Sequence, residues 1–278
     1  MSEAARQLQL SPAAIAQQMR VLEHDMGCSL LVRQGRNVRP NGAGQRLYAK
    51  GQLLLRSLHE LRDHVGAEED AGELRLGTLN TALHGFLPDV LRRFTQAHAR
   101  VQLHIRTGLA PELYAALMHG ELDAALCLKP TFELPKSVLW HPLRHEPLVV
   151  LAPAASAHLG PLELLRTQPL IRYDRRLGGG KLADDHLRTL GITPLERFEI
   201  NSVLAIALLV EHGLGVALVP DIGPALTQGR TIQALPLPQT TPSAPSGREV
   251  GLLWMRASPR QGWIQGLLQC AQAVPPQG

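Results

Sequence analysis

The chain has 278 residues and a formal net charge of +4, and 45% of its residues are hydrophobic but only 4% aromatic. Its length allows more than one domain with an aliphatic core. No apolar run reaches the about 18 residues of a membrane-spanning helix, so we expect no membrane partner. The three cysteines form no CxxC pair and no Cys/His cluster, which argues against a disulfide framework, a zinc site and a metal cofactor. Without a secretory signal pattern, a cytoplasmic protein is expected.

The excess positive charge lies at the N-terminal end. Residues 1–66 contain nine lysines and arginines but five acidic residues, whereas residues 67–278 contain 19 of each. No acidic residue occurs between Asp25 and Glu60. A solvated basic surface would explain this charge if the charge were the only observation. Beside a DNA-binding pattern, the same positive charge favours a polyanionic partner.

The first forty residues predict two short helices and a hairpin. Ser2 and Ser11 are N-caps, Pro12 occupies a first helical position, and Gly27 ends the second helix. Apolar residues of the second helix recur at intervals of four and three and are expected to face inward: Ile15, Met19, Leu22 and Met26. Residues 30–32 and 37–38 predict two strands of a basic wing. Together these elements outline a winged helix-turn-helix, an all-α unit that places one helix in the DNA major groove.

The predicted DNA-binding side chains lie on the second helix and on the wing. On the helix, the residues that face away from the core are Ser11, Ala13, Gln17, Gln18 and Arg20. On the wing, we expect Arg33, Arg36 and Arg39 to contact phosphates and the minor groove.

Residues 43–66 predict a connecting helix that Asn41 caps. Its seam has a period of 3.5 residues and consists of Leu47, Gly51, Leu54, Leu58, Leu61 and Val65. Such a seam favours a second helix as partner, and hence a homodimer or homotetramer. The alternative is an amphipathic helix docked on its own protein. A hinge is expected at residues 66–72.

From Glu73 onward, predicted strands and helices alternate, which is typical of parallel sheets covered by helices. Strands are expected at residues 74–78, 101–106, 124–128, 148–151, 170–173, 198–200, 216–219 and 251–255. Helices are expected at residues 85–97, 111–119, 182–190, 203–212 and 258–273. The run Gly178–Lys181 lacks the complete pattern of a phosphate loop and is interpreted as a flexible loop of the cleft. Cys127 lies in an apolar strand and is expected to be an inert core residue.

Several of these motifs resemble the LysR-type transcriptional regulators. In the N-terminal part they are Ala4-Ala-x-x-Leu8-x-Leu10-Ser11 and Met19-Arg-x-Leu-Glu23; in the C-terminal part they are Gly120-Glu-Leu-Asp-Ala-Ala125 and Gly213-Leu-Gly-Val-Ala-Leu-Val-Pro220. The resemblance implies a multi-domain protein with a DNA-binding domain at 1–42 and a linker helix at 43–66. It also implies a C-terminal α/β domain with the two-lobed, type II periplasmic-binding-protein-like fold. Lobe I would comprise residues 73–145 with 245–278, and lobe II residues 146–244.

The chain departs from the family pattern in its DNA-binding part. Where the family typically has Ser-Gln-Pro-Ala-Leu-Ser-Arg-Gln, residues 11–18 read Ser-Pro-Ala-Ala-Ile-Ala-Gln-Gln. Pro12, Ala16 and Gln17 therefore stand where the family commonly has DNA-contacting side chains. The family pattern also begins with a helix before Ser2, so that the winged helix-turn-helix is incomplete here. We expect either that the true start lies upstream or that the protein lacks this helix and binds DNA poorly.

The resemblance implies a small effector between the two lobes, outside the carboxyl ends of strands and near helix N-termini. The candidate effector-binding residues are Asn80, Thr81, Thr107, Gly108, Arg172, Asp174 and Ser202. Leu109 and Ala110 replace hydroxyl residues that are frequent in the family, which predicts a less polar side of the cleft. Arg172 favours an anionic effector; the alternative is an exposed arginine at a strand end. Each polar residue taken singly is also explained as a helix cap.

We therefore expect a regulator that binds promoter DNA and responds to a small molecule. The main alternative is a sensor of the same family with impaired or lost DNA binding. An extracytoplasmic solute-binding protein would explain the cleft but not the basic helix-turn-helix. An enzyme is not expected, because no set of catalytic residues such as a Gly-x-Ser-x-Gly elbow occurs.

Overall fold

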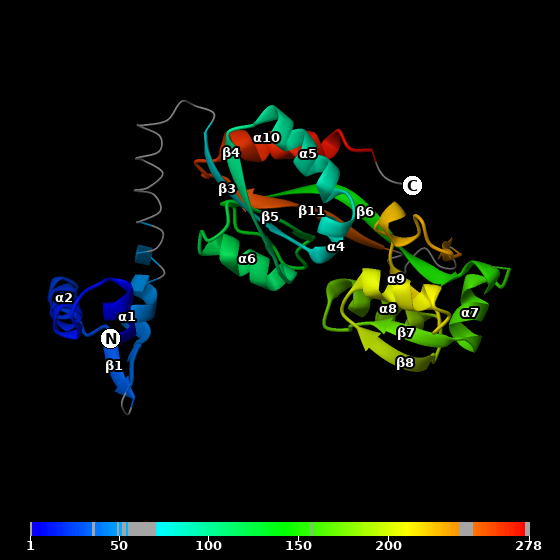
Figure 1. The fold of residues 1–278 in the computed structure, drawn as a ribbon, viewed down its shortest axis with the longest axis horizontal. Helices are drawn as coiled ribbons and strands as arrows, with labels where there is room; N and C mark the ends of the chain where they lie inside the picture. The colour runs from blue at the N-terminus through cyan, green and yellow to red at the C-terminus, as the bar shows by residue number, and fades with distance from the viewer. Residues whose placement is uncertain are drawn as a thin grey trace. The chain divides into compact units, whose positions relative to one another are not determined.

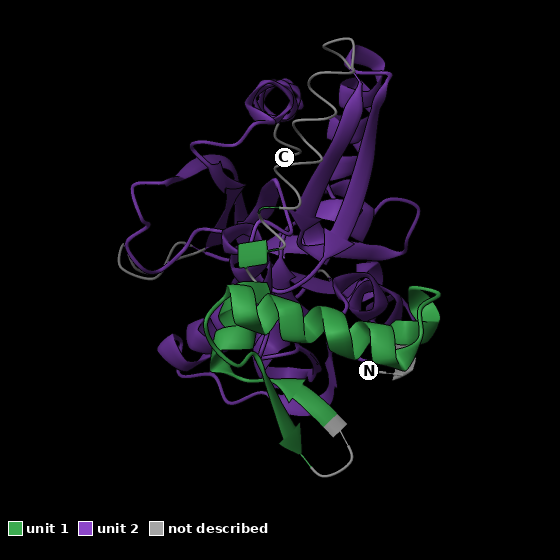
Figure 2. Ribbon diagram, turned by 90° about the vertical axis from the view of Figure 1, so that its left-hand side faces the viewer, with its two compact units in different colours: residues 1–66 green, residues 67–278 purple. Residues whose placement is uncertain are grey.

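The computed structural model describes residues 2–34, 37–48, 50–51, 54, 71–156, 158–238 and 247–275. The chain divides into two compact units, unit 1 at residues 1–66 and unit 2 at residues 67–278 (Figure 2). Among the described residues, no helix combines the length and the apolar character that crossing a membrane requires.

Unit 1 contains helices α1 (Ser2–Gln7) and α2 (Pro12–Asp25) and an antiparallel hairpin of β1 (Leu31–Gln34) and β2 (Asn37–Pro40). The predicted ends of the second helix are confirmed. The Ser11 hydroxyl accepts the N–H of Ala14 at 3.1 Å, and Gly27 has a φ of +65°, which only glycine adopts readily. Residues 42–48 are helical, and the Asn41 side chain caps them by accepting the N–H of Gly44 at 2.9 Å.

The core of unit 1 is small. Ala5, Ile15 and Leu30 are buried, but Leu22 and Met26 are exposed, so the prediction that the whole apolar face of α2 points inward is wrong for these two residues. The physical reason is that no described segment of unit 1 covers the C-terminal half of α2 on that side. The end of α2 is instead joined to β1 by Glu23, whose carboxylate accepts the N–H of Leu30 at 2.7 Å. This hydrogen bond is the main reason that the pKa of Glu23 is lowered.

The predicted connecting helix at 43–66 lies largely outside the described residues. Of its seam, Leu58, Leu61 and Val65 are outside them, as are Arg36 in the wing and most of the predicted hinge. The helical residues 42–48 agree with the predicted start of that helix.

Unit 2 is built on a seven-stranded sheet with the order β10-β6-β11-β5-β3-β4, in which β9 also pairs with β6. Figure 1 labels β6, β11, β5, β3 and β4 of this sheet. The bounds of these strands are β3 Gly72–Thr78, β4 Val101–Thr107, β5 Ala124–Leu128, β6 Val138–Pro153, β9 Ala217–Pro220, β10 Ile232–Pro236 and β11 Gly247–Met255. β3 is parallel to β4 and β5, but β11 is antiparallel to β5 and β6. The prediction of parallel pairing is therefore confirmed for β3, β4 and β5 but wrong for β11, because β6 leaves lobe I and β11 returns beside it.

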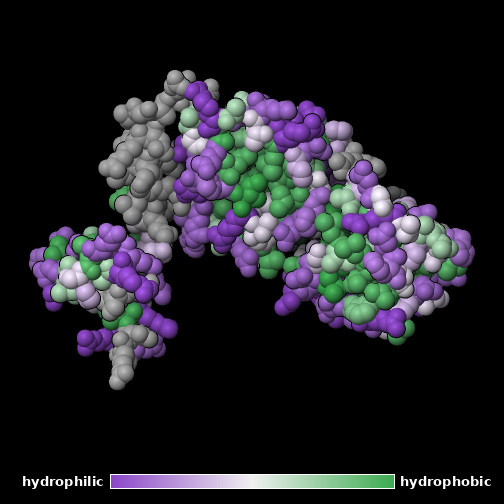
Figure 3. Space-filling model, viewed as in Figure 1, coloured by the Kyte–Doolittle hydropathy of each residue, from purple (hydrophilic) through white to green (hydrophobic). Residues whose placement is uncertain are grey.

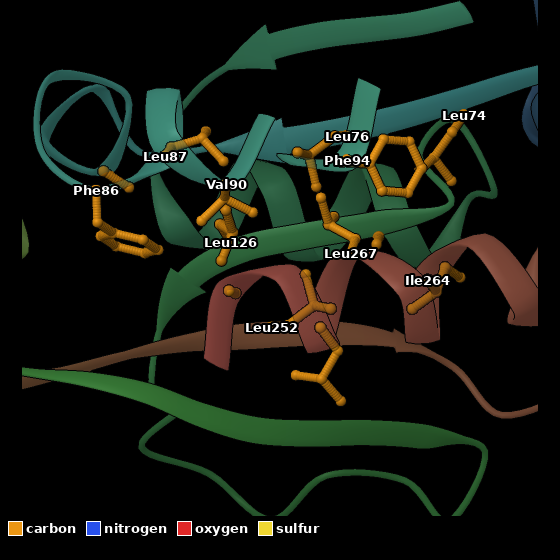
Figure 4. Close-up of a cluster of buried hydrophobic side chains, with 14 of the residues drawn as sticks. Leu74, Leu76, Phe86, Leu87, Val90, Phe94, Leu126, Leu252, Ile264 and Leu267 are labelled. Atoms are coloured by element: carbon orange, nitrogen blue, oxygen red, sulfur yellow. The ribbon is translucent and has the colours of Figure 1, made fainter. Parts of the chain in front are cut away.

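The core of lobe I lies between the sheet and two helices, α5 (Leu87–Ala97) and α10 (Gln261–Gln272). Figure 4 shows Val90 and Phe94 of α5 and Ile264 and Leu267 of α10 directed toward sheet residues such as Leu126. The opposite face of the sheet is covered by α6 (Ala110–Met118), which buries Leu113 and Leu117. A short helix, α4 (Asn80–His84), follows β3 and was not predicted.

Lobe II contains β7 (Pro169–Tyr173), which pairs in parallel with β8 (Leu195–Ile200), and the 3-10 turns η1 (Ala154–Ser156) and η2 (Pro224–Leu226). A parallel bridge from Leu170 to Val216 links β7 to the segment that enters β9. Its helices are α7 (Pro161–Thr167), α8 (Gly178–Thr189) and α9 (Val203–Glu211), and the sequence did not predict α7 or β10.

The interpretation of Gly178–Lys181 as a flexible loop is wrong, because these residues form the first turn of α8. The reason for glycine is close packing: a Cβ at Gly180 would overlap the carbonyl oxygen of Asp174. The prediction for Cys127 is confirmed, since the side chain is buried and burial raises the pKa of its thiol to about 12.

Candidate functional site

A cavity of about 560 Å³ lies where the ends of several strands of unit 2 face the first turns of helices. Asn80 and Thr81 reach it from the start of α4, and Thr107 and Gly108 reach it from the end of β4. Tyr173 from the end of β7 and Gly178 at the start of α8 line it from lobe II. Four of the seven predicted effector-binding residues are thus brought together at the carboxyl ends of strands, a usual location of ligands in α/β folds.

A buried arginine, Arg248 at the start of β11, forms part of the cavity wall. One Nη donates to the hydroxyl of Thr81 at 2.7 Å and lies 2.6 Å from Oε2 of Glu146, which belongs to β6. Both charged side chains are buried, at 8% and 6% exposure. Burial raises the pKa of Glu146, and the charge of Arg248 acts in the opposite direction. Arg248 therefore joins α4 of lobe I to the strands that run into lobe II.

The lobe II side of the cavity is cationic. Arg176 and Lys181 line it together with the first turn of α8, whose free N–H groups and helix dipole favour an anion. Arg176 is paired with Asp174 at 2.7 Å, and this bond lowers the pKa of the carboxyl. Lys181 makes no ion pair with any residue that the structure describes. The described lining includes one carboxylate, that of Glu112, which accepts the N–H of Leu109 at 3.0 Å.

Arg172, Asp174 and Ser202 do not line this cavity. Arg172 is 5% exposed, and its guanidinium lies 2.6 Å from carboxylate oxygens of both Asp184 and Glu196, so the alternative of an exposed strand-end arginine is wrong. The Ser202 hydroxyl caps α9 by accepting the N–H of Ala205 at 3.3 Å. Its neighbour Asn201 lines the cavity instead.

The remaining wall of the cavity is apolar. It consists of Leu79, Leu109, Ala110, Pro111 and Leu128, mainly from the N-terminal end of α6 and the end of β5. This is the side for which the sequence predicts fewer polar groups.

Sequence reasoning missed Arg248 and Tyr173, and it assigned Lys181 to a loop of the cleft without naming it as an effector-binding residue. Arg248 is 167 positions from Thr81, and only the pairing of β11 in the sheet brings the two together. The three glycines before Lys181 could have indicated a cavity position. However, a glycine run is compatible with a loop as well as with a tightly packed helix start. Among the described residues, no group of His, Cys, Asp and Glu has the geometry of a metal site.

In unit 1, the predicted DNA-binding residues of α2 are all exposed: Ser11, Ala13, Gln17, Gln18 and Arg20. Arg20 donates to the side-chain oxygen of Gln17 at 2.7 Å, and Ser11 is occupied as the helix cap. Arg33 and Arg39 are exposed on the paired strands of the hairpin, and Arg36 lies outside the described residues. Unit 1 therefore presents an exposed helix face and a basic hairpin.

Comparisons with known proteins agree on both units. The family model "LysR substrate binding domain" matches residues 67–275, and the model "Bacterial regulatory helix-turn-helix protein, lysR family" matches residues 1–45. The chain is 32% identical to the uncharacterized HTH-type transcriptional regulator YnfL of Escherichia coli, over 78% of this chain and 75% of that protein.

Solved structures show the same fold. A cysteine-substituted variant of full-length OxyR from Pseudomonas aeruginosa superposes with a TM-score of 0.71 at 24% identity, over 100% of this chain and 92% of its own. The effector-binding domain of QuiR in complex with shikimate has a TM-score of 0.59 at 18% identity, over 73% of this chain and 96% of its own.

Proposed function

Because the chain belongs to the LysR family of bacterial transcriptional regulators, we propose that α2 and the basic hairpin bind promoter DNA while the cavity of unit 2 binds a small anionic effector. The protein is a DNA-binding regulator that responds to an effector through its C-terminal domain. The family consists of regulators, and we propose no catalytic activity and no cofactor for this member.

One observation carries the effector site: Asn80, Thr81, Thr107 and Gly108 meet the first turn of α8 and Lys181 around one cavity. Hydroxyl and amide groups there can orient a ligand, and the cations on the lobe II side favour a negative charge. Asp174 and Arg172 are bound to other side chains and support the site from outside the lining.

We further propose the domain boundaries expected from the sequence, with DNA-binding residues 1–42, a linker helix at 43–66, and lobes at 73–145 with 245–278 and at 146–244. A cytoplasmic homodimer or homotetramer fits this organisation. Exposed apolar residues on unit 2 support self-association: Figure 3 shows hydrophobic residues over α9, where Leu208 is exposed.

The function is tested by the salt dependence of binding to the DNA upstream of the protein's own gene, measured by fluorescence anisotropy. We expect the logarithm of the affinity to fall linearly with the logarithm of the salt concentration. Arg33→Ala and Arg39→Ala should each flatten that slope by about 0.9, because each removes one phosphate contact. Lys136→Ala, an exposed cation in unit 2, is the matched control and should leave the slope unchanged.

A second candidate function is a sensor of the same family with impaired DNA binding. Two observations favour it: Pro12 and Ala16 lack the side chains that the family pattern has there, and the oxygen of Gln17 is occupied by Arg20. Absence of promoter affinity, or an affinity that does not change with salt, would contradict the first function and favour this one.

A further inference from the structure

A second cavity, of about 340 Å³, lies on lobe I beside α6. It is lined by Tyr114 of α6, Cys127 of β5, Phe132 in the segment after β5 and Leu253 of β11. The proposed DNA and effector sites do not use it. Its volume is in the range of about 300–1,000 Å³ that is usual for small-molecule sites.

The lining of this lobe I cavity is apolar and aromatic. The rings of Tyr114 and Phe132 are in an edge-to-face arrangement with centroids 5.1 Å apart. The Cys127 thiol, with its raised pKa, stays neutral and adds to the apolar wall. Phe132 is 52% exposed, so a large aromatic surface faces an open cavity rather than a packed core. A flat apolar group would gain by burial against these rings.

The lobe I cavity borders the cavity of about 560 Å³ that is proposed as the effector site, which is called the effector cleft from here on. Ala110, Pro111, Leu128 and Thr131 line both, so the two cavities meet at these residues. The cation in the described lining of the lobe I cavity, Lys129, is bound to Glu249 at 2.7 Å. As far as the described lining shows, the cavity therefore offers a ligand no unpaired charge, whereas Lys181 in the cleft has no ion-pair partner among the described residues.

We propose that the effector is an amphiphilic organic anion that spans both cavities. Its carboxylate or similar group would lie at Lys181 and the first turn of α8, and its apolar, aromatic part would pass Pro111 and Leu128 to rest against Tyr114 and Phe132. This inference rests on the proposed effector site in the cleft and adds the class of ligand and a second subsite in lobe I.

The test is calorimetric titration of the purified full chain with three matched probes. 3-Phenylpropionate carries both the charge and the ring, propionate carries only the charge, and 3-phenylpropanamide carries only the ring. We expect 3-phenylpropionate to bind at least about tenfold more tightly than either of the other two, because each of these gives up one of the two subsites.

Two substitutions separate the subsites. Phe132→Ala should weaken 3-phenylpropionate about tenfold while leaving propionate unchanged, and Lys181→Met should weaken both acids. Leu195→Ala and Lys136→Met are the matched controls, since each removes an exposed side chain of the same kind outside the two cavities, and both should bind as the unmodified chain does.

Any one of the following outcomes would overturn the proposal. Equal affinities for propionate and 3-phenylpropionate, or an unchanged affinity in Phe132→Ala, would show that the lobe I cavity is not part of the effector site. A Phe132→Ala variant that changes only self-association in sedimentation would make this patch an interface between copies. Failure of all three probes would reject the ligand class. Salt-dependent promoter binding by the same preparation would then show that the proposed function still holds.

Discussion

Arg172 shows how the role of a single charged residue depends on its partners. It stands near the end of β7, a position for which the sequence predicts a ligand-binding arginine. In the structure, Asp184 and Glu196 neutralise its charge inside lobe II. Arg248 is the opposite case, because nothing in its local sequence marks it, yet it reaches Thr81 beside the cavity. The type of a single residue therefore indicates which interactions it can make, but not where in the fold it lies.

His186 in α8 gives a pH-dependent prediction. The imidazole is 8% exposed, and burial lowers its pKa. Its contribution to stability is therefore complete above the unfolded pKa of about 6.5 and is lost as the pH falls below it, because the unfolded chain takes up a proton that the folded protein resists. The fall in Tm between about pH 7.5 and about pH 5.5 should be smaller in His186→Leu than in the unmodified protein.

The control for this prediction is His119→Gln, which changes an exposed imidazole and should keep the unmodified pH dependence. Thermal unfolding followed by circular dichroism at a series of pH values makes the comparison. Equal pH dependence in His186→Leu and the unmodified chain would contradict the assigned role of His186.

Among the elements, α8 illustrates how packing decides between a loop and a helix. Its first turn is glycine-rich because the backbone of Asp174 comes close to Gly180. Gly180→Ala should cost about 1–3 kcal/mol of unfolding free energy, since a backbone oxygen has no room to move aside. Gly262→Ala, in the first turn of α10 with nothing near its Cβ, should be neutral or stabilise the protein by up to about 1 kcal/mol. Urea unfolding of both variants checks this, and similar stabilities would refute the packing argument.

For unit 2 as a whole, the Glu146–Arg248 pair lies where β6 and β11 pass from one lobe to the other. Glu146→Ala should lower the unfolding free energy by about 3–5 kcal/mol, because it leaves a buried guanidinium without its carboxylate. The double substitution Glu146→Met with Arg248→Met should recover most of this loss, since no uncompensated charge remains buried. Chemical unfolding of the unmodified chain and of these two variants makes the comparison. A single substitution that costs less than about 1 kcal/mol would show that the pair is not essential to this junction.

Local sequence features are sufficient to identify the family and most of the helices and strands, although α4, α7 and β10 were not predicted. The caps at Ser11 and Asn41, the turn at Gly27 and the apolar strands of unit 2 are local features, and local features are set by a residue's own backbone preferences and its near neighbours. Thr81 and Thr107 could be predicted as cavity residues for the same reason, because a polar residue just after a strand can be recognised from the sequence alone.

The grouping of side chains around a cavity and the orientation of the strands follow from the three-dimensional fold and not from local sequence. The antiparallel return of β11, the place of Arg248 beside Thr81 and Glu146, and the border between the cleft and the lobe I cavity all join residues distant in the chain. Such contacts depend on strand register and on close packing between elements, and neither leaves a periodic trace in the sequence around the residues involved.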